Sequence, residues 1–252
     1  MRAPQTRETL PMAGAIGLIG GTGWPSTALY YERLNRLAEP GTVPVLIASL
    51  SFAPILADAE RGRFDLVTAA FVAAGQGLAA AGAGVIGLCA ATAHLAFDAV
   101  AAAVPVPCLH IAEPFRRPAD LLPNGLLPNG LLSDGLPSKG AAVGVLGTAQ
   151  TLEQGVFSGP LAAAGHRVVT PDAGLAAGLD RAIKTGISSG RPTPADIAAV
   201  QAALDDLVAG GADAVVLGCT ELPLIRDRLR PAVPLIDAVA AHCQALLSRS
   251  RG

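Results

Sequence analysis

VVLGCTELP, residues 215–223, is an apolar run that ends abruptly in a thiol, a hydroxyl and a carboxylate. A short apolar run before a polar turn is typical of a buried parallel strand. In open α/β sheets, ligands bind beyond the carboxyl ends of such strands. A thiol there, at Cys219, can act as an acid, a base or a nucleophile once its neighbours adjust its pKa. The alternative is a small buried core residue, which is the commoner role of a single cysteine.

The same pattern occurs earlier in the chain. Residues 82–92, GAGVIGLCAAT, align without gaps to residues 211–221, GADAVVLGCTE. An internal repeat of this kind indicates two pseudo-equivalent lobes with a site between them. In this register Ala90, not Cys89, is equivalent to Cys219, and in a strand a shift of one residue changes the face. We therefore expect a thiol at the strand end of the second lobe and none at that of the first.

Segments of strand length, such as residues 15–20 and 142–146, alternate with helical stretches, such as residues 66–81 and about 152–164. This alternation favours parallel sheets built from βαβ units. The predicted fold class is α/β, with two pseudo-symmetric lobes, each a parallel sheet flanked by helices, and the active site in the cleft between them. We expect residues 14–114 together with 235–252 to form the first lobe and residues 140–234 to form the second.

A segment of different composition lies between the two predicted lobes. Residues 121–135 repeat the pattern L-L-P/S-N/D-G, which is rich in turn formers. We interpret residues 118–139 as a loop insertion between the lobes. Its leucines either cover another part of the molecule or, as we favour, belong to a tolerated surface insertion.

Composition excludes several classes of protein. The net charge of −2, without a cluster of Lys or Arg, argues against a nucleic-acid partner. No apolar run reaches the roughly 18 residues that span a bilayer, so no membrane partner is expected. The four cysteines form no CxxC pair, which indicates neither a metal site nor a disulfide framework. With no secretory signal at the start, a reduced, cytoplasmic setting is the expectation.

Four motifs lie at predicted strand ends or just after them. They are GLIGG at 17–21, Ser26-Thr27 with Tyr30-Tyr31, LGT at 146–148 and LGCTE at 217–221. This set resembles the aspartate/glutamate racemase family of the Asp/Glu/hydantoin racemase superfamily, from about Ala15 onward. The similarity is closest to the broad-specificity aspartate/glutamate racemases, in which Cys-Thr-Asn-Thr-Met-His stands in the place of residues 89–94.

The resemblance implies an enzyme without a cofactor that acts on a small carboxylic or amino acid, and a homodimer. One cysteine from each lobe would face the substrate α-carbon, so that one thiolate removes the α-proton while the opposite thiol delivers another. Cys219 and His94 match catalytic or orienting positions of the family. The expected substrate-binding residues are Gly21, Thr22, Ser26, Thr27, Ala90, Ala91, Thr92, Thr148, Thr220 and Glu221. Each hydroxyl among them has helix capping as its alternative role.

The chain departs from the family pattern at the first acid/base position. Ala90 stands there, and a methyl group cannot transfer a proton. Ala91 replaces an amide that would orient the substrate. Ser51, Ala149 and Gly178 stand where relatives tend to carry Asp, Arg and Lys. The contacts for a side-chain carboxylate are therefore largely missing, and a substrate other than free aspartate is favoured.

Three functions fit these residues. The favoured interpretation is a cofactor-independent racemase or epimerase with Cys219 as acid/base and an altered substrate or impaired two-base chemistry. The second is a cofactor-free decarboxylase, a lyase in which Cys219 is the sole proton donor. The third is a catalytically degenerate homologue that binds a metabolite.

Overall fold

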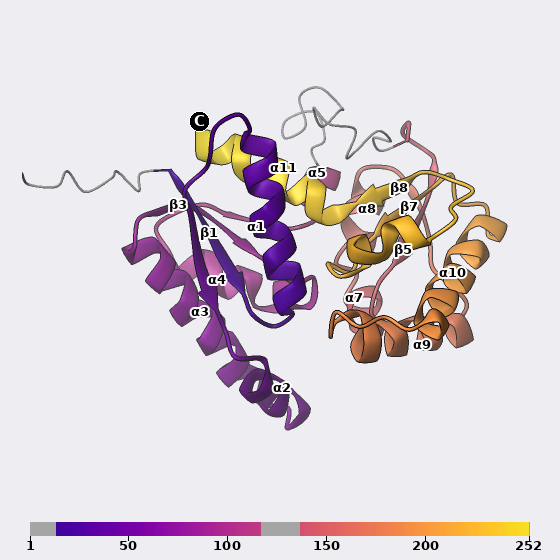
Figure 1. The fold of residues 1–252 in the computed structure, drawn as a ribbon, viewed down its shortest axis with the longest axis horizontal. Helices are drawn as coiled ribbons and strands as arrows, with labels where there is room; N and C mark the ends of the chain where they lie inside the picture. The colour runs from indigo at the N-terminus through magenta and orange to yellow at the C-terminus, as the bar shows by residue number, and fades with distance from the viewer. Residues whose placement is uncertain (1–13, 117–136, 252) are drawn as a thin grey trace, which may run out of the picture.

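The computed structural model describes residues 14–116 and 137–251, so the repeat at 121–135 and most of the predicted insertion lie outside the described residues. Two parallel four-stranded sheets form the centre of the molecule (Figure 1). The first sheet has the order β2-β1-β3-β4 and the second the order β6-β5-β7-β8. The two orders are the same when β1 to β4 are matched to β5 to β8, as the internal repeat predicts.

The strands of the first sheet are β1 (Ala15–Gly20), β2 (Val45–Ser49), β3 (Ala83–Leu88) and β4 (Cys108–Leu109). Those of the second are β5 (Ala142–Leu146), β6 (Arg167–Val169), β7 (Ala214–Leu217) and β8 (Leu235–Asp237). The central strands β1, β5 and β7 are buried along their whole length. Strands covered on both faces read as continuous apolar runs, which is why the sequence predicts them well.

Helices cover both sheets, and this confirms the predicted α/β class. In the first half these are α1 (Trp24–Ala38), α2 (Phe52–Glu60), α3 (Phe64–Ala80), η1 (Thr92–Ala96), α4 (Phe97–Ala103) and α5 (Glu113–Arg116). In the second they are α7 (Ala149–Glu153), α8 (Ser158–Ala163), α9 (Ala173–Ala182), η2 (Ile183–Ile187), α10 (Pro194–Ala209) and η3 (Leu222–Arg228). The last helix is α11 (Ala238–Arg251). Within the described ranges no helix has both the length and the apolar character needed to cross a membrane.

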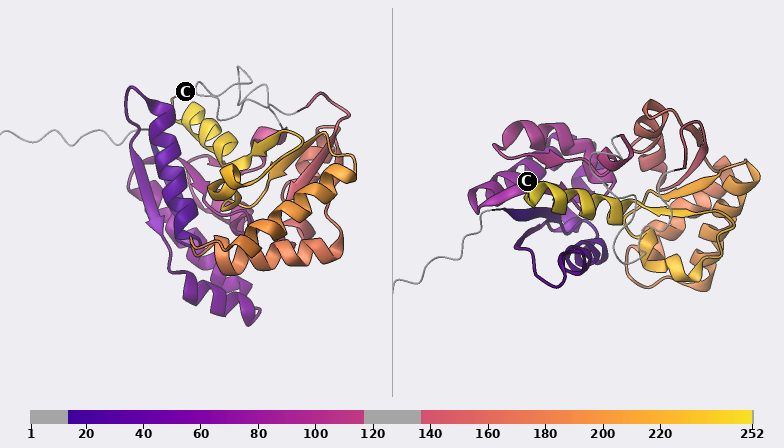
Figure 2. Two further views of the ribbon diagram at one scale, coloured as in Figure 1. Left: turned by 45° about the vertical axis from the view of Figure 1, so that its right-hand side comes forward. Right: turned by 90° about the horizontal axis from the view of Figure 1, so that it is seen from above.

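Residues 235–251 are shared between the two halves: β8 belongs to the second sheet and α11 packs on the first half. The sequence predicts residues 235–252 in the first lobe alone. Leu235 and Ile236 pair with Val215 and Val216, so β8 is the edge strand of the second sheet. Helix α11 then returns and packs against α1 and β3 of the first half (Figure 1, Figure 2). The crossing point is Asp237, whose carboxylate accepts a hydrogen bond from Ala240 N and caps α11.

Candidate active site

Cys219 is the first residue after the last hydrogen bond between β7 and β5, which Gly218 makes. Leu217 is the last paired residue, and Gly218 N donates to Leu146 O at 2.7 Å. The chain then turns into η3, with Leu222 N bonded to Cys219 O at 3.1 Å. This turn directs the Cys219 Sγ–H toward Glu221 Oε2, at a distance of 3.0 Å. A buried thiol therefore donates to a buried carboxylate two residues further along.

The environment of Cys219 keeps its thiol protonated. Burial raises the pKa of Cys219 well above its usual value, and the Glu221 carboxylate raises it further by its charge and as a hydrogen-bond acceptor. The backbone N–H groups of Glu221 and Leu222 act in the opposite direction and lower the pKa. The Cys219 thiol is thus protonated next to a base, the Glu221 carboxylate. The backbone N–H groups of Glu221 and Leu222 can stabilise the thiolate once it forms.

A side chain from the first half completes this arrangement. Ser26 Oγ lies 3.0 Å from Thr220 Oγ1, and Thr220 Oγ1 lies 3.1 Å from Glu221 Oε2. A Cβ added to Gly23, in the loop before α1, would collide with Glu221 Oε1. The predicted residues Ser26, Thr220, Glu221 and Cys219 are therefore brought together where the two halves meet.

The loop after β1 has a different role for Thr27 and Gly21. Thr27 Oγ1 accepts a hydrogen bond from Gly21 N at 3.0 Å. Gly21 has a φ of +91°, and an added Cβ would collide with Leu50 O. Only glycine adopts this conformation without strain. Both residues shape the loop, and the Thr27 hydroxyl is already used within it.

Thr148 is a helix cap in the structure. Its Oγ1 accepts from Thr151 N at 3.2 Å and shares a hydrogen bond with Thr151 Oγ1 at 2.9 Å. The sequence favours substrate binding for this residue over capping. In the structure its hydroxyl caps α7, which begins directly after Thr148, and substrate binding by Thr148 stays a prediction.

The sheet register supports the equivalence of Ala90 and Cys219. Leu88 pairs with Ile19 as Leu217 pairs with Leu146, and Cys89 N donates to Ile19 O as Gly218 N does to Leu146 O. Cys89 is thus the counterpart of Gly218, and the next residue, Ala90, is the counterpart of Cys219. Cys89 itself is 2% exposed within the core between β1, β3 and α11.

His94 has no nitrogen free for proton transfer. Its Nδ1–H donates to Ala90 O at 2.9 Å, and its Nε2 accepts from Ile111 N at 3.0 Å. Burial, followed by the neighbouring His110 and His242, lowers the pKa of His94 well below its usual value. The ring is therefore neutral, and it fixes the backbone at Ala90. These contacts suit the orienting alternative for His94, and its catalytic role stays a prediction.

The remaining predicted residues surround the first strand end. Ala91 is buried in the core next to β5. Thr92 begins η1, and Thr22 lies partly exposed in the loop before α1. The hydroxyl groups of Thr22 and Thr92 form no hydrogen bond within the part of the chain that the structure describes. Both are available to a ligand.

Two features of this region are missed by the sequence. One is Gly23, whose lack of a side chain admits Glu221. The other is Arg33 of α1, whose Nη2 lies 2.6 Å from Asp237 Oδ2 in a pair almost fully removed from solvent. Both depend on contacts between residues about 200 positions apart, for which local sequence patterns carry no signal.

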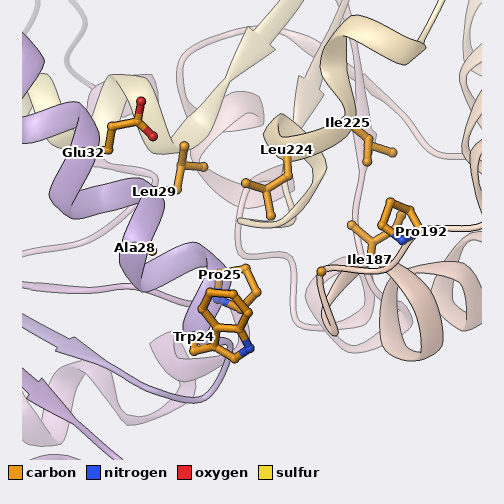
Figure 3. Close-up of a pocket in the computed structure, with 10 residues that line it drawn as sticks. Trp24, Pro25, Ala28, Leu29, Glu32, Ile187, Pro192, Leu224 and Ile225 are labelled. Carbon is orange, nitrogen blue, oxygen red and sulfur yellow. The ribbon is translucent and has the colours of Figure 1, made fainter.

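An apolar groove of about 390 Å³ lies between α1 and the η2 and η3 segments (Figure 3). Trp24, Pro25 and Leu29 form one wall, and Ile187, Leu224 and Ile225 form the other. Glu32 is the charged residue in its lining. Among the described residues, no group of three or more His, Cys, Asp or Glu side chains could hold a metal ion.

Comparison with known proteins gives one family and several similar structures. The sequence profile of the family described as Asp/Glu/Hydantoin racemase matches residues 19–246. A candidate Asp/Glu racemase from Yersinia pestis is 27% identical, with 94% of this chain and 99% of that chain covered and a TM-score of 0.76. An aspartate racemase homologue from Pyrococcus horikoshii OT3 is 25% identical, with 95% and 100% covered and a TM-score of 0.72. The aspartate racemase of Picrophilus torridus shares the fold, at 21% identity, 94% coverage of both chains and a TM-score of 0.70.

Proposed function

Because the chain belongs to the Asp/Glu/hydantoin racemase family, we propose that it is a cofactor-independent isomerase that removes and returns the α-proton of an amino acid or a related carboxylic acid. The observation that carries the proposal is the hydrogen bond from the Cys219 thiol to Glu221 Oε2, 3.0 Å long, at the end of a central strand. A thiol and a carboxylate at this distance can exchange a proton directly.

The chemical step uses both groups. The Cys219 proton passes to Glu221 Oε2, and the resulting thiolate takes the α-proton of the substrate. The electron pair of the broken C–H bond moves into the substrate carboxylate, which becomes an enediolate. The backbone N–H groups of Glu221 and Leu222 stabilise the thiolate. Cys219 then returns a proton to the α-carbon, and Glu221 returns its proton to the Cys219 thiolate, which completes the cycle.

The opposite face of the substrate limits this chemistry. Inversion needs a proton donor on that face, and Ala90 offers only a methyl group. A positioned acid or base contributes about 10²–10⁴ to the rate. We therefore propose an enzyme that exchanges the α-proton readily from the Cys219 face and inverts the centre slowly.

We propose a substrate other than free aspartate. Ala149, in a place where relatives tend to carry Arg, gives its backbone N–H to Asp180 Oδ1 at 2.9 Å. The Asp180 carboxylate is also paired with Lys184, whose Nζ lies 2.8 Å from Asp180 Oδ2, so this lysine is already used and Ala149 supplies no cation for a substrate carboxylate. An uncharged substrate side chain also suits the apolar groove between α1, η2 and η3, whose lining contains no cation among the described residues.

We propose that the chain forms a homodimer in the cytoplasm, by analogy with the family that it resembles. Multi-angle light scattering would give about twice the 25.2 kDa of one chain. A mass equal to that of one chain at micromolar concentration would contradict the dimer and leave the proposed chemistry untouched.

The test is proton NMR in D₂O on a panel of amino acids and substituted malonates. We expect the α-proton signal of at least one substrate to disappear with the native protein and to persist with Cys219→Ala. Cys108→Ala is the matched control, because Cys108 is partly exposed and lies on the edge strand β4.

Two outcomes would overturn the proposal. Loss of CO₂ from a malonate that depends on Cys219 would identify the decarboxylase. Absence of any exchange that depends on Cys219, across the panel, would favour the homologue that only binds a metabolite.

A further inference from the structure

Three buried hydrogen bonds join α1 to Cys219. Ser26 Oγ lies 3.0 Å from Thr220 Oγ1, Thr220 Oγ1 lies 3.1 Å from Glu221 Oε2, and Cys219 Sγ lies 3.0 Å from the same oxygen. Ser26 is completely buried and Thr220 is 1% exposed. Ser26 belongs to the helix after β1, whereas the other three residues follow β7. The series therefore crosses from one half of the molecule to the other.

The carboxylate fixes the direction of this series. An ionised Glu221 only accepts hydrogen bonds, so Thr220 must donate its single hydroxyl proton to it. The Thr220 oxygen then accepts from Ser26, which makes Ser26 the first donor. Each of the two hydroxyl groups therefore has a single acceptor. A hydroxyl that accepts one hydrogen bond donates a stronger one, so the bond from Ser26 strengthens the bond from Thr220 to Glu221.

The other carboxylate oxygen, Glu221 Oε1, is positioned by close packing against Gly23. Gly23 and Ser26 lie on the same turn at the start of α1, and an added Cβ at Gly23 would collide with Glu221 Oε1. The first half of the molecule thus restrains both oxygens, one through the hydroxyl series and the other through close packing. The turn between β7 and η3 supplies only Thr220 and Cys219 as partners of Glu221 Oε2.

We propose that Ser26 is a positioning residue that holds the Glu221 carboxylate against the Cys219 thiol across the junction between the two sheets. This inference rests on the proposed role of Cys219 and assigns Ser26 a task other than contact with substrate. It implies that the proton affinity of Cys219 depends on how closely α1 and the second half approach.

Loss of the Ser26 hydrogen bond should lower the pKa of the Cys219 thiol. Among the described residues, Glu221 is the charged group that acts on Cys219, and it raises the pKa of that thiol. Without the Ser26 donor, Thr220 and Glu221 are free to turn away from Cys219. The thiol then loses an anionic acceptor, and its pKa falls.

The experiment measures alkylation of Cys219 by iodoacetamide between pH 6 and 11, followed on the Cys219 peptide by mass spectrometry. The midpoint of the curve reports the thiol pKa, and the plateau at high pH reports access to the thiol. No substrate is needed. Glu221→Gln is the reference variant, and we expect its midpoint to fall by at least one pH unit, equivalent to a tenfold gain in thiolate at neutral pH.

Two variants break the series and two leave it intact. Ser26→Ala removes the first donor, and Thr220→Val removes the relay hydroxyl while keeping the shape of the side chain. We expect both to lower the midpoint, with a gain in thiolate of at least threefold at neutral pH. Thr220→Ser keeps the hydroxyl and should retain the native midpoint. Thr193→Val is the matched control, because Thr193 loses a comparable hydroxyl at the cap of α10.

A purely structural Ser26 would give a different result. In that case Ser26→Ala and Thr220→Val would lower the melting temperature, as we expect for Thr193→Val, and would leave the midpoint at its native value. That outcome would overturn the inference. If Cys219 alkylation responds as expected while no substrate exchanges its α-proton, the proposed function fails and the positioning role of Ser26 stands.

Discussion

Cys219 and Ala90 occupy equivalent places at the ends of β7 and β3, and only one of them can carry a proton. The asymmetry extends to their surroundings. Cys219 faces a carboxylate, whereas the carbonyl of Ala90 is fixed by the neutral ring of His94. For the proposed chemistry, the Cys219 thiol therefore has its hydrogen-bond partner in place, whereas the Ala90 position has a fixed backbone and no reactive side chain.

Replacing Ala90 with Cys should restore inversion. A thiol at this position supplies the missing donor, and a positioned acid contributes about 10²–10⁴ in rate. We expect the rate of interconversion of enantiomers to rise at least tenfold relative to the rate of α-proton exchange, measured by chiral chromatography and by NMR on the same samples. Cys89→Ala is the control and should not change that ratio. A variant that keeps exchange dependent on Cys219 and still fails to invert would contradict the equivalence of the two positions.

Gly23→Ala should lower activity at little cost in stability. Its φ of −149° is extended backbone that alanine adopts freely, but the new methyl group would displace Glu221 from its place beside Cys219. We expect α-proton exchange to fall at least tenfold, with a melting temperature within a few degrees of the native value. Gly77→Ala is the control, because nothing lies within 4 Å of an added Cβ there. Equal exchange rates for the two variants would show that the position of Glu221 is unimportant.

At the scale of elements, prediction from sequence succeeds where burial is uniform. Residues 15–20 and 142–146 are predicted as strands and are found as β1 and β5, since both are buried at every position. The helix predicted from Leu152 to Ala164 is instead divided into α7 and α8, because Gly155 between them adopts a φ of +64°. Helix α2 is missed, and it contains no buried residue whose spacing could have indicated it.

In the candidate site, too, the sequence predicts some residues and misses the roles of others. Cys219, Thr220 and Glu221 are predictable because polar residues that end a central strand lie at the usual ligand position of α/β sheets. The functions of Ser26 and Gly23 are set by their contacts with the 219–221 turn, which comes from the other sheet. A single sequence does not reveal which distant turn meets which helix.

The packing of three histidines between η1, β4 and α11 should make the protein sensitive to mild acid. Burial lowers the pKa of His110 to about 4 and that of His242 to about 3. Both values lie below the ordinary 6.5, so between about pH 6.5 and 4 the unfolded chain binds protons that the folded chain does not. Stability is therefore lost as the pH falls through this window. For the fully buried His242 we expect a loss of about 1.4 kcal/mol per pH unit.

Urea unfolding at several pH values tests this sensitivity. His110→Asn removes one of the titrating groups and leaves an oxygen that can accept from Ala112 N, as His110 Nδ1 does at 3.0 Å. The variant should show a shallower fall in the free energy of unfolding between pH 6.5 and 4. Parallel curves for native protein and variant would mean that His110 carries no part of the effect.

At the scale of the whole molecule, α5 packs against α8, with the Phe115 and Phe157 rings 5.6 Å apart, and α1 makes a second set of contacts between the two halves. Its first turn touches Thr220 and Glu221, and its middle carries Arg33, which pairs with Asp237 at the point where β8 passes into α11. Because Asp237 also caps α11, one carboxylate connects the edge of the second sheet to two helices of the first half. We therefore expect this ion pair to contribute to the relative position of the sheets and to the distance from Ser26 to Thr220.

Breaking that pair should destabilise the fold and disturb the site together. Arg33→Met leaves Asp237 as a buried charge without its cation, and removing one partner of a buried pair costs about 3–5 kcal/mol. We expect the free energy of unfolding in urea to fall by that amount, and Asp237→Asn to recover part of it when added to Arg33→Met. The control is Arg36→Met, since Arg36 and Glu32 form an exposed pair at 2.8 Å on the same helix, and such pairs contribute about 0–1 kcal/mol. Additive effects of the two substitutions in the double variant would show that Arg33 and Asp237 act independently. In that case, the hydrogen bonds of Ser26 and the packing of Gly23 would have to align the two halves without the help of this ion pair.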